Sequence, residues 1–247
     1  MNMTSMSASN KRVVVIGGGA AGTMAAGCAA EHGAAVTLLE PNDRLGKKLL
    51  ITGKGRCNVT NDCPWEDVLK NTPTNPRFLY SALSRFSPAD AKAFFEVHGC
   101  ALKTERGNRV FPVSDRSSDV QAALERYLRQ TGVQVRHTRA TEIAVQDGAV
   151  CGVKTANGPI PADAVILATG GCSYPLTGST GDGYRMAAAL GHTIVEPVGS
   201  LVPLVERGHD CAAMQGLALK NVTLRLKNAK GKVVFEEFGE LLCTHFG

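Results

Sequence analysis

Residues 13–40 read VVVIGGGAAGTMAAGCAAEHGAAVTLLE, and this stretch constrains the possible fold more than any other. Residues 13–16 form an apolar run, which is typical of a parallel strand buried on both faces. A glycine-rich turn follows, then a helix of small residues predicted over 20–32, then a second strand ending at Glu40. The order of these parts predicts a βαβ unit of the kind that binds dinucleotides.

Each glycine of the fingerprint Gly17-x-Gly19-x-x-Gly22 has its own expected role. Gly17 permits the tight turn, Gly19 lets backbone approach a pyrophosphate, and Gly22 lets the helix pack close to the strand. The helix N-terminus supplies free N–H groups and partial positive charge for phosphates. Glu40, about 20 residues further on, can accept hydrogen bonds from ribose hydroxyls. The alternative is a glycine-rich loop that serves only packing, but this would not explain why a glutamate follows the second strand.

The composition narrows the class of protein. Hydrophobic residues make up 44% of the 247 residues and charged residues 20%, which is ordinary for a globular chain. The net charge of +5 is mild and the basic residues are scattered, so a nucleic-acid partner is not favoured. No apolar run approaches the roughly 18 residues of a membrane helix. The eight cysteines include no CxxC pair and the histidines have no metal-ligand spacing, so we expect reduced thiols, a cytoplasmic location and no metal site.

Residues 44–61, RLGKKLLITGKGRCNVTN, form a second candidate wall of the binding site. Glycines in such a loop expose backbone amides to an anion, and basic side chains add charge for phosphates. A solvated basic loop is the alternative, but its position soon after Glu40 favours the cofactor. The candidate residues are Lys47, Lys48, Gly53, Gly55, Arg56, Cys57 and Asn58.

Cys57 also invites a redox interpretation. Its basic neighbours would lower the pKa of a thiol. A cysteine in a glycine-rich loop also fits simply because it is small, and no CxxC pair supports the redox role. No histidine or carboxylate stands out as an acid or base, so we assign no catalytic residue.

A third candidate wall is VILATGG, residues 165–171. A buried strand that ends in a glycine turn returns the chain to the dinucleotide site. The backbone of Ala168, Thr169 and Gly170 can then approach the cofactor, because little side-chain bulk intervenes. A turn that serves only packing is the alternative. Together with the N-terminal βαβ unit and an intervening meander, this segment indicates FAD rather than NAD.

The remaining elements follow from periodicity and turn residues. Helical patterns cover 76–98, with a break near Ser87-Pro88. We expect a capping box at Ser118 and Gln121, a cap at Thr180 or Asp182, and a hairpin turn at Asp147-Gly148. The predicted helices are 119–130 and 181–190, and the predicted strands are 133–138, 141–147, 149–155 and 164–168, the first three forming the meander.

The domain organisation changes near residue 196. Residues 1–10 are polar and predict a disordered tail, and 11–195 hold the predicted α/β, Rossmann-like domain. Residues 196–247 read as strand-like pieces at 201–205, 221–227, 232–238 and 241–244. About 50 residues are few for an independent core, so we interpret this part as an incomplete β-rich substrate domain and the chain as truncated.

Several motifs together resemble the BaiN-like, or aminoacetone oxidase-like, NAD(P)/FAD-dependent oxidoreductases. The resemblance covers about residues 11–247. The segments that carry it are VIGGGAAG, LGKKLLITGKGRCNVTN, NRVFPVSDRSSDV, ATGGCSYPLTGSTGDGYRMAAALGHTI and GELLCTHFG.

The resemblance implies an FAD-binding domain of the glutathione reductase type, with a β-meander and a non-covalent FAD. The adenosine ribose would lie on Glu40, the flavin near 53–58 and 169–170, and adenine against the backbone near Ala140. The pyrophosphate would lie on the fingerprint, including Ala20 and Ala21.

The implied activity is hydride or electron transfer through the flavin, most simply by an NAD(P)H-linked reductase of a small or enone-like substrate. Three alternatives stay open. They are an amine or aminoketone oxidase that uses O2, an inactive FAD-binding fragment, and a protein that modifies or docks on RNA. We expect a small-molecule substrate, no membrane partner and, as the composition indicates, no nucleic acid.

Overall fold

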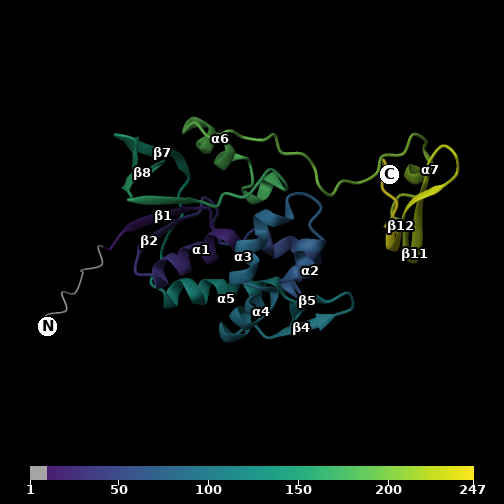
Figure 1. Cartoon of the computed structure of the whole chain (residues 1–247), viewed down its shortest axis with the longest axis horizontal. Coiled ribbons are helices and arrows are strands. Elements are labelled where there is room, and N and C mark those ends of the chain that lie inside the picture. The colour runs from purple at the N-terminus through teal and green to yellow at the C-terminus, as the bar shows by residue number, and fades with distance from the viewer. Residues whose placement is uncertain (1–9) are drawn as a thin grey trace. The chain divides into compact units, whose positions relative to one another are not determined.

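The computed structural model describes residues 10–247, which form two compact units, one ending at Val195 and the other spanning Glu196–Gly247. The first unit contains a four-stranded parallel sheet (Figure 1). Its central strands are β1 (Arg12–Ile16) and β2 (Ala35–Leu39), joined by α1 (Ala20–Glu31) as predicted. β10 (Ala164–Leu167) pairs with the other side of β1, and β6 (Gln134–Arg136) pairs with β2.

The central strand β1 is buried on both faces along Val13–Ile16, which confirms the expectation from its apolar run. Successive strand residues point to opposite faces, so Val14 and Val15 belong to different cores. Val14 packs in one cluster with Val153 of the meander, and Val15 packs in another with Leu128 of α5 (Ser117–Gln130). Helices therefore cover one face and the meander covers the other (Figure 1). Burying each valine contributes about 1.5–3 kcal/mol.

The meander consists of three antiparallel strands, β7 (Ala140–Gln146), β8 (Ala149–Thr155) and β9 (Gly158–Pro161). The predicted turn at 147–148 is confirmed, with φ of 51° and 78° at its two residues. The assignment of 133–138 to the meander was wrong. That segment extends the parallel sheet as β6, and the third meander strand is the proline-containing β9, since proline is tolerated at an edge.

A small sheet of order β3-β5-β4 was not predicted; its strands are β3 (Thr60–Asn61), β4 (Leu102–Glu105) and β5 (Arg109–Pro112). The expected break at Ser87 is confirmed, because Ser87 accepts a hydrogen bond from the Asp90 amide at 3.2 Å and caps α4. The helical segments around that break are α2 (Trp65–Lys70), η2 (Pro76–Leu79), α3 (Tyr80–Arg85) and α4 (Pro88–Val97).

Two helix starts differ from the predictions. The capping box at Ser118 and Gln121 is wrong, because α5 begins at Ser117, two residues earlier than predicted, and the Gln121 side chain donates to the Leu45 carbonyl at 3.0 Å. The helix α6 (Asp182–Ala189) follows an N-terminal glycine that has no side-chain cap, so neither Thr180 nor Asp182 caps it. In α5 the Gln121 side chain bonds a distant residue instead of the helix N-terminus, and α6 begins after a glycine turn instead of a capping side chain.

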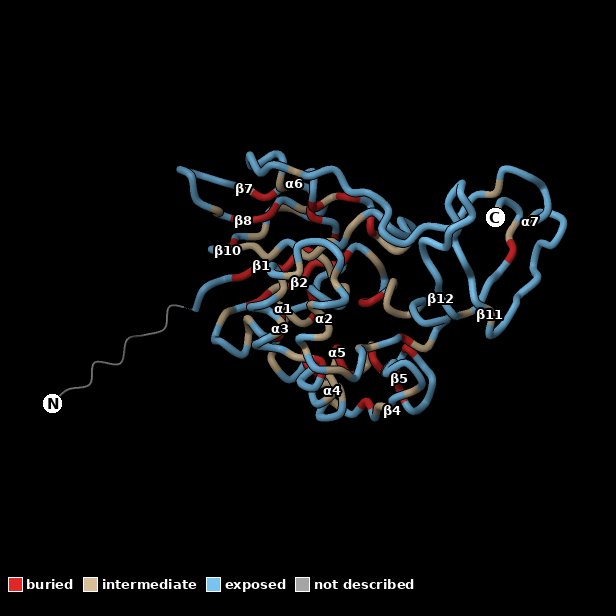
Figure 2. Tube along the Cα trace, turned by 45° about the vertical axis from the view of Figure 1, so that its right-hand side comes forward, coloured by how far each residue is buried: buried red, intermediate tan, exposed pale blue. Residues whose placement is uncertain are grey.

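The second unit contains the short helix α7 (Asp210–Ala213) and the antiparallel strands β11 (Ala218–Lys227) and β12 (Val233–Leu242). The predicted pieces at 232–238 and 241–244 fall largely on one strand, and the strand at 201–205 is absent. Most of the unit's residues are exposed (Figure 2). Throughout residues 10–247, no helix has the length and hydropathy needed to cross a bilayer.

An ion pair joins the starts of two sheet strands and gives the fold a pH dependence. Arg12 of β1 donates its Nε to Asp163 at 3.1 Å and its backbone N–H at 2.8 Å, and these bonds lower the pKa of Asp163 to about 2. A depressed folded-state pKa gives stability above the ordinary value of 3.8, which is lost as the pH falls toward 2.

We therefore expect Asp163→Asn to lower the melting temperature at neutral pH, with the difference from the parent protein narrowing as the pH approaches 2. Thermal unfolding at stepped pH measures this. Glu142→Gln, which removes one partner of the exposed pair with Lys154, is the control and should have a smaller effect. A difference for Asp163→Asn that stays constant with pH would contradict the assignment.

Candidate dinucleotide site

A cavity of about 830 Å³ opens at the carboxyl ends of the parallel strands, with Ile16, Leu39 and Leu167 in its lining. This is the edge at which open α/β sheets bind ligands. The volume is within the range of about 300–1,000 Å³ that is usual for small-molecule sites. All of the lining residues belong to the first unit.

The fingerprint glycines separate into two kinds. A Cβ on Gly17, where φ is +109°, would lie 2.4 Å from the Ala168 carbonyl oxygen, and one on Gly22 would lie 1.8 Å from the Gly17 oxygen. The chain itself therefore requires these two glycines. A Cβ on Gly19 would meet no atom within 4 Å, although Gly19 lines the cavity. The open space at Gly19 fits the close approach of a ligand to the backbone.

The residues after Gly19 continue this wall. Ala20 and Ala21 also line the cavity, whereas Gly22 packs beneath it and is not part of the lining. The first turn of α1 contains no acidic side chain. Its N-terminus thus faces the cavity with the partial positive charge of the helix dipole uncompensated, as an anionic group requires.

Glu40 directly follows β2 and is buried, with only 7% of the residue exposed. One carboxylate oxygen accepts the Gly18 N–H at 2.8 Å, and the other accepts the Asn42 backbone N–H at 2.9 Å and its side-chain amide at 2.6 Å. A carboxylate has about four acceptor sites, so it can brace the fingerprint loop and still accept from a ligand. The sequence reasoning missed Gly18 and Asn42, because their bonds to Glu40 appear only in the folded chain.

Asn42 also ties a distant loop to this wall. Its side-chain amide donates to the Thr177 carbonyl oxygen at 3.2 Å, and its backbone carbonyl lies 2.6 Å from Nδ1 of His137. Lys47 Nζ lies 3.4 Å from the Asn42 Oδ1, and Lys48 Nζ lies 3.3 Å from Ser173. Both lysines line the cavity. Neither forms an ion pair with a carboxylate of the described residues, so both add uncompensated positive charge to the cavity wall.

The GKGRCN loop contributes only part of its residues to the cavity. Cys57 and Asn58 line it, while Gly53, Gly55 and Arg56 do not. Four of its residues have left-handed backbone, including the non-glycine Cys57 at φ +61°. For the two non-glycine residues, Lys54 and Cys57, this conformation costs about 1–3 kcal/mol each and persists only where the surroundings enforce it.

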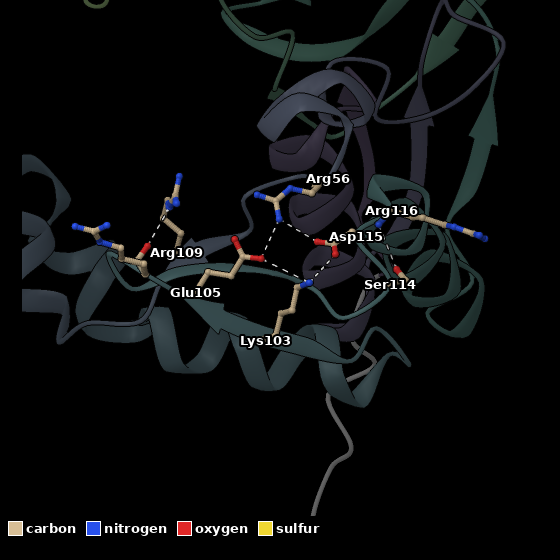
Figure 3. A network of polar contacts seen from close by, with 8 residues as sticks. Arg56, Lys103, Glu105, Arg109, Ser114, Asp115 and Arg116 are labelled. Carbon is tan, nitrogen blue, oxygen red and sulfur yellow. Dashed lines mark hydrogen bonds and ion pairs between the residues drawn. The ribbon is translucent and has the colours of Figure 1, made fainter. Parts of the chain in front are cut away.

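Arg56 lies in a network of charges beside β4 and β5 (Figure 3). Its Nη1 is 2.9 Å from Glu105 and 3.0 Å from Asp115, and its guanidinium carbon is 3.9 Å from the centre of the Phe111 ring. Lys103 lies 2.6 Å from Asp115. The Arg56 hydrogen bond lowers the pKa of Glu105, and the bonds from Lys103 and then Arg56 lower that of Asp115. The geometry makes Arg56 an anchor for the strained loop.

The Cys57 thiol differs from the sequence expectation. Burial raises its pKa, and the hydrogen bond with Thr52 opposes this only in part. The prediction that basic neighbours lower this pKa was wrong, because Arg56 is paired with carboxylates. The thiol is therefore protonated at neutral pH, which does not suit a redox role.

We expect iodoacetamide to modify Cys57 more slowly than the exposed Cys151 and Cys172, because only the thiolate reacts. Peptide mapping by mass spectrometry after timed alkylation of the folded protein measures the three rates. Equal rates in the denatured protein provide the control. Faster modification of Cys57 than of the exposed cysteines would show an accessible thiolate and contradict this assignment.

The third wall comes from the segment after β10. Ala168, Thr169 and Gly170 line the cavity, as does Ala140 at the start of β7. Sequence reasoning missed the apolar part of the lining, which includes Phe86, Phe95 and Met186. The helical spacing around Phe95 was the available signal, but it indicates a buried face without showing that the face borders a cavity. Among the described residues, no group of three or more His, Cys, Asp or Glu side chains is placed to hold a metal ion.

The parallel sheet, the fingerprint turn and the meander define a Rossmann-type, FAD-binding fold. The chain belongs to the family described as the HI0933-like protein Rossmann domain, which matches residues 11–243.

Curated proteins with named activities are similar to this chain. The chain is 36% identical over 239 residues to a 3-dehydro-bile acid delta(4,6)-reductase of Clostridium scindens, covering 96% of this chain and 57% of that protein. It is 28% identical over 238 residues to a ribosomal RNA dihydrouridine synthase of Escherichia coli, covering 95% of this chain and 57% of that protein. The chain thus spans little more than half the length of these relatives.

A solved structure supports the fold alone. A flavocytochrome c3 fumarate reductase in its open conformation superposes with a TM-score of 0.52 and 21% identity, over 85% of this chain and 47% of that one.

Proposed function

We propose that this chain binds FAD non-covalently in the cavity of the first unit and forms part of an FAD-dependent oxidoreductase. The observation that carries the proposal is the empty space beside the Gly19 backbone, where a Cβ would meet no atom within 4 Å, in a cavity that Glu40 also borders. A packing turn needs small residues where atoms crowd it, as at Gly17 and Gly22, but has no need of a glycine facing open space.

In this proposal the three walls hold different parts of the dinucleotide. The fingerprint amides and the N-terminus of α1 hold the pyrophosphate, and Glu40 accepts from the adenosine ribose. The backbone at Ala140 borders adenine. The flavin lies toward 57–58 and 169–170, all of which line the cavity. Gly53, Gly55 and Arg56 then support the flavin wall indirectly, through the loop backbone.

FAD, when bound, would supply the hydride or electron transfer itself. The residues of the chain would bind it, orient it and shape the charge around it. Lys47 and Lys48 bring uncompensated positive charge to the cavity wall, which stabilises negative charge that develops during reduction. The titratable residues of the cavity lining include Asp182 and Tyr184 but no histidine, and we assign no catalytic acid or base.

We further propose an NAD(P)H-linked reductase of a small, enone-like substrate. The names of the relatives support this class: a bile acid delta(4,6)-reductase and a dihydrouridine synthase each describe hydrogen added across a carbon–carbon double bond. The apolar side chains in the lining suit a largely apolar substrate.

Anaerobic titration of the FAD-loaded protein with NADPH tests this proposal. We expect the visible absorption of oxidised flavin to bleach, and to return when an enone substrate is added. An amine or aminoketone oxidase would instead be bleached by aminoacetone and recover with O2. Failure of NADPH and NADH to bleach a fully loaded flavin would exclude the reductase, and a protein that cannot be loaded with FAD would be an inactive fragment.

RNA is the second candidate substrate, because of the relatives named ribosomal RNA dihydrouridine synthases. Binding of a ribosomal RNA fragment at stepped salt concentrations distinguishes it. Phosphate contacts would make the affinity fall steeply with salt, whereas an enone reductase for small molecules should show weak binding without a steep salt dependence.

A further inference from the structure

The first unit contains a second cavity, of about 350 Å³, which the dinucleotide proposal does not use. It lies where the end of β6 meets the β8–β9 turn, and its lining includes Arg136, His137, Thr138 and Asn157. The next two residues after Thr138, Arg139 and Ala140, line the larger cavity. A single stretch of chain thus borders both cavities.

The charge of this lining favours an anion. Arg136 is exposed, and its guanidinium forms no hydrogen bond or ion pair with any residue from 10 to 247. His137 has its Nδ1 fixed 2.6 Å from the Asn42 carbonyl oxygen, so the ring is oriented while Nε2 stays available. The lining contains no aspartate or glutamate. An arginine fork beside an oriented imidazole is a common arrangement for binding oxyanions.

Thr138 provides an independent sign that a ligand belongs here. The residue is 8% exposed, and its hydroxyl oxygen is the buried side-chain polar atom in the described chain that has no hydrogen-bond partner. Buried polar groups are almost always paired. Thr138 also lines the cavity. Its hydroxyl is enclosed by protein in this conformation, so rotation of the side chain would bring it to a polar ligand bound there.

We propose that this cavity binds a phosphate group through Arg136, His137 and Thr138. The volume admits either free phosphate or the phosphate of a small organic ester. The proposal does not depend on FAD, because none of these three residues lines the larger cavity.

Isothermal titration calorimetry of the full chain with inorganic phosphate, and separately with ribose 5-phosphate, tests the site against chloride at equal ionic strength. We expect saturable one-to-one binding of at least one ligand. Tighter binding of ribose 5-phosphate assigns the site to a phosphate ester, and equal or tighter binding of inorganic phosphate assigns it to the free ion. No saturable binding of either would overturn the proposal.

Matched variants locate the binding. Arg136→Ala should weaken it about tenfold or more, while Arg129→Ala, at an exposed position of α5 with only a 3.9 Å pair to Glu125, should not change it. Thr138→Val keeps the shape of the side chain and should weaken binding several-fold without lowering the melting temperature, because it removes an unpaired hydroxyl. Equal affinities for the Arg136 and Arg129 variants, or unchanged binding with a lower melting temperature in Thr138→Val, would contradict the site.

Discussion

Gly19→Val is expected to abolish tight FAD binding while leaving the fold almost as stable as before. Nothing lies within 4 Å of the added Cβ, and the backbone is extended at φ −78°, which valine adopts readily. The change in helix capping costs about 1 kcal/mol at most. The valine carbons would occupy the space that the pyrophosphate needs, so we expect the affinity to fall about 100-fold, or about 2.8 kcal/mol. Quenching of flavin fluorescence measures the affinity and urea unfolding measures the stability.

Two other glycines provide matched controls. Gly22→Val should lose both FAD and stability, because its Cβ would lie 1.8 Å from the Gly17 carbonyl oxygen. Gly239→Val, in β12 of the second unit and also with no atom within 4 Å, should lose neither. Normal FAD content in Gly19→Val would show that the pyrophosphate does not lie on the fingerprint.

The fold could be predicted where the signal was local. The unit formed by β1, α1 and β2 is confirmed, since an apolar run, a glycine turn and a small-residue helix follow one another directly. The position of β6 could not be predicted, because its three residues are all exposed and only their pairing with β2 places them in the parallel sheet. The edge strand β9 was missed because its two prolines oppose strand formation in a local view.

Candidate site residues could be predicted from the sequence where the residue type has one plausible role in binding a dinucleotide. Most of the proposed cofactor-binding residues line one cavity. Arg56 shows where this reasoning ends, because its charge suits a phosphate as well as a carboxylate. Only the fold brings Glu105 and Asp115 to it. Asn42 was missed for the same reason, since its role depends on Thr177, far along the chain.

The second large effect is expected at Glu40, where Glu40→Gln should lower the free energy of unfolding by about 1–3 kcal/mol. The two carboxylate oxygens face three N–H groups, from Gly18 and Asn42. A glutamine keeps the shape but places an NH2 group against one set of these donors, whichever way the amide is turned. FAD affinity should fall as well, because the ribose loses a charged acceptor. Glu31→Gln is the control, since Glu31 accepts the Tyr127 hydroxyl at 2.8 Å and does not line the cavity.

A double variant separates the two roles of Glu40. In Glu40→Gln with Asn42→Asp, the glutamine NH2 can donate to the new carboxylate, so the bond between the two side chains reforms with its direction reversed. Asn42→Asp alone also loses its donation to the Thr177 carbonyl oxygen, so the restored brace between residues 40 and 42 should appear as a favourable coupling between the two changes when both single variants are measured beside the double variant. FAD affinity should stay low, because the group facing the ribose is still an amide. If affinity returned together with stability, Glu40 would act only by holding the fingerprint loop, and the ribose would have to be bound elsewhere on the cavity wall.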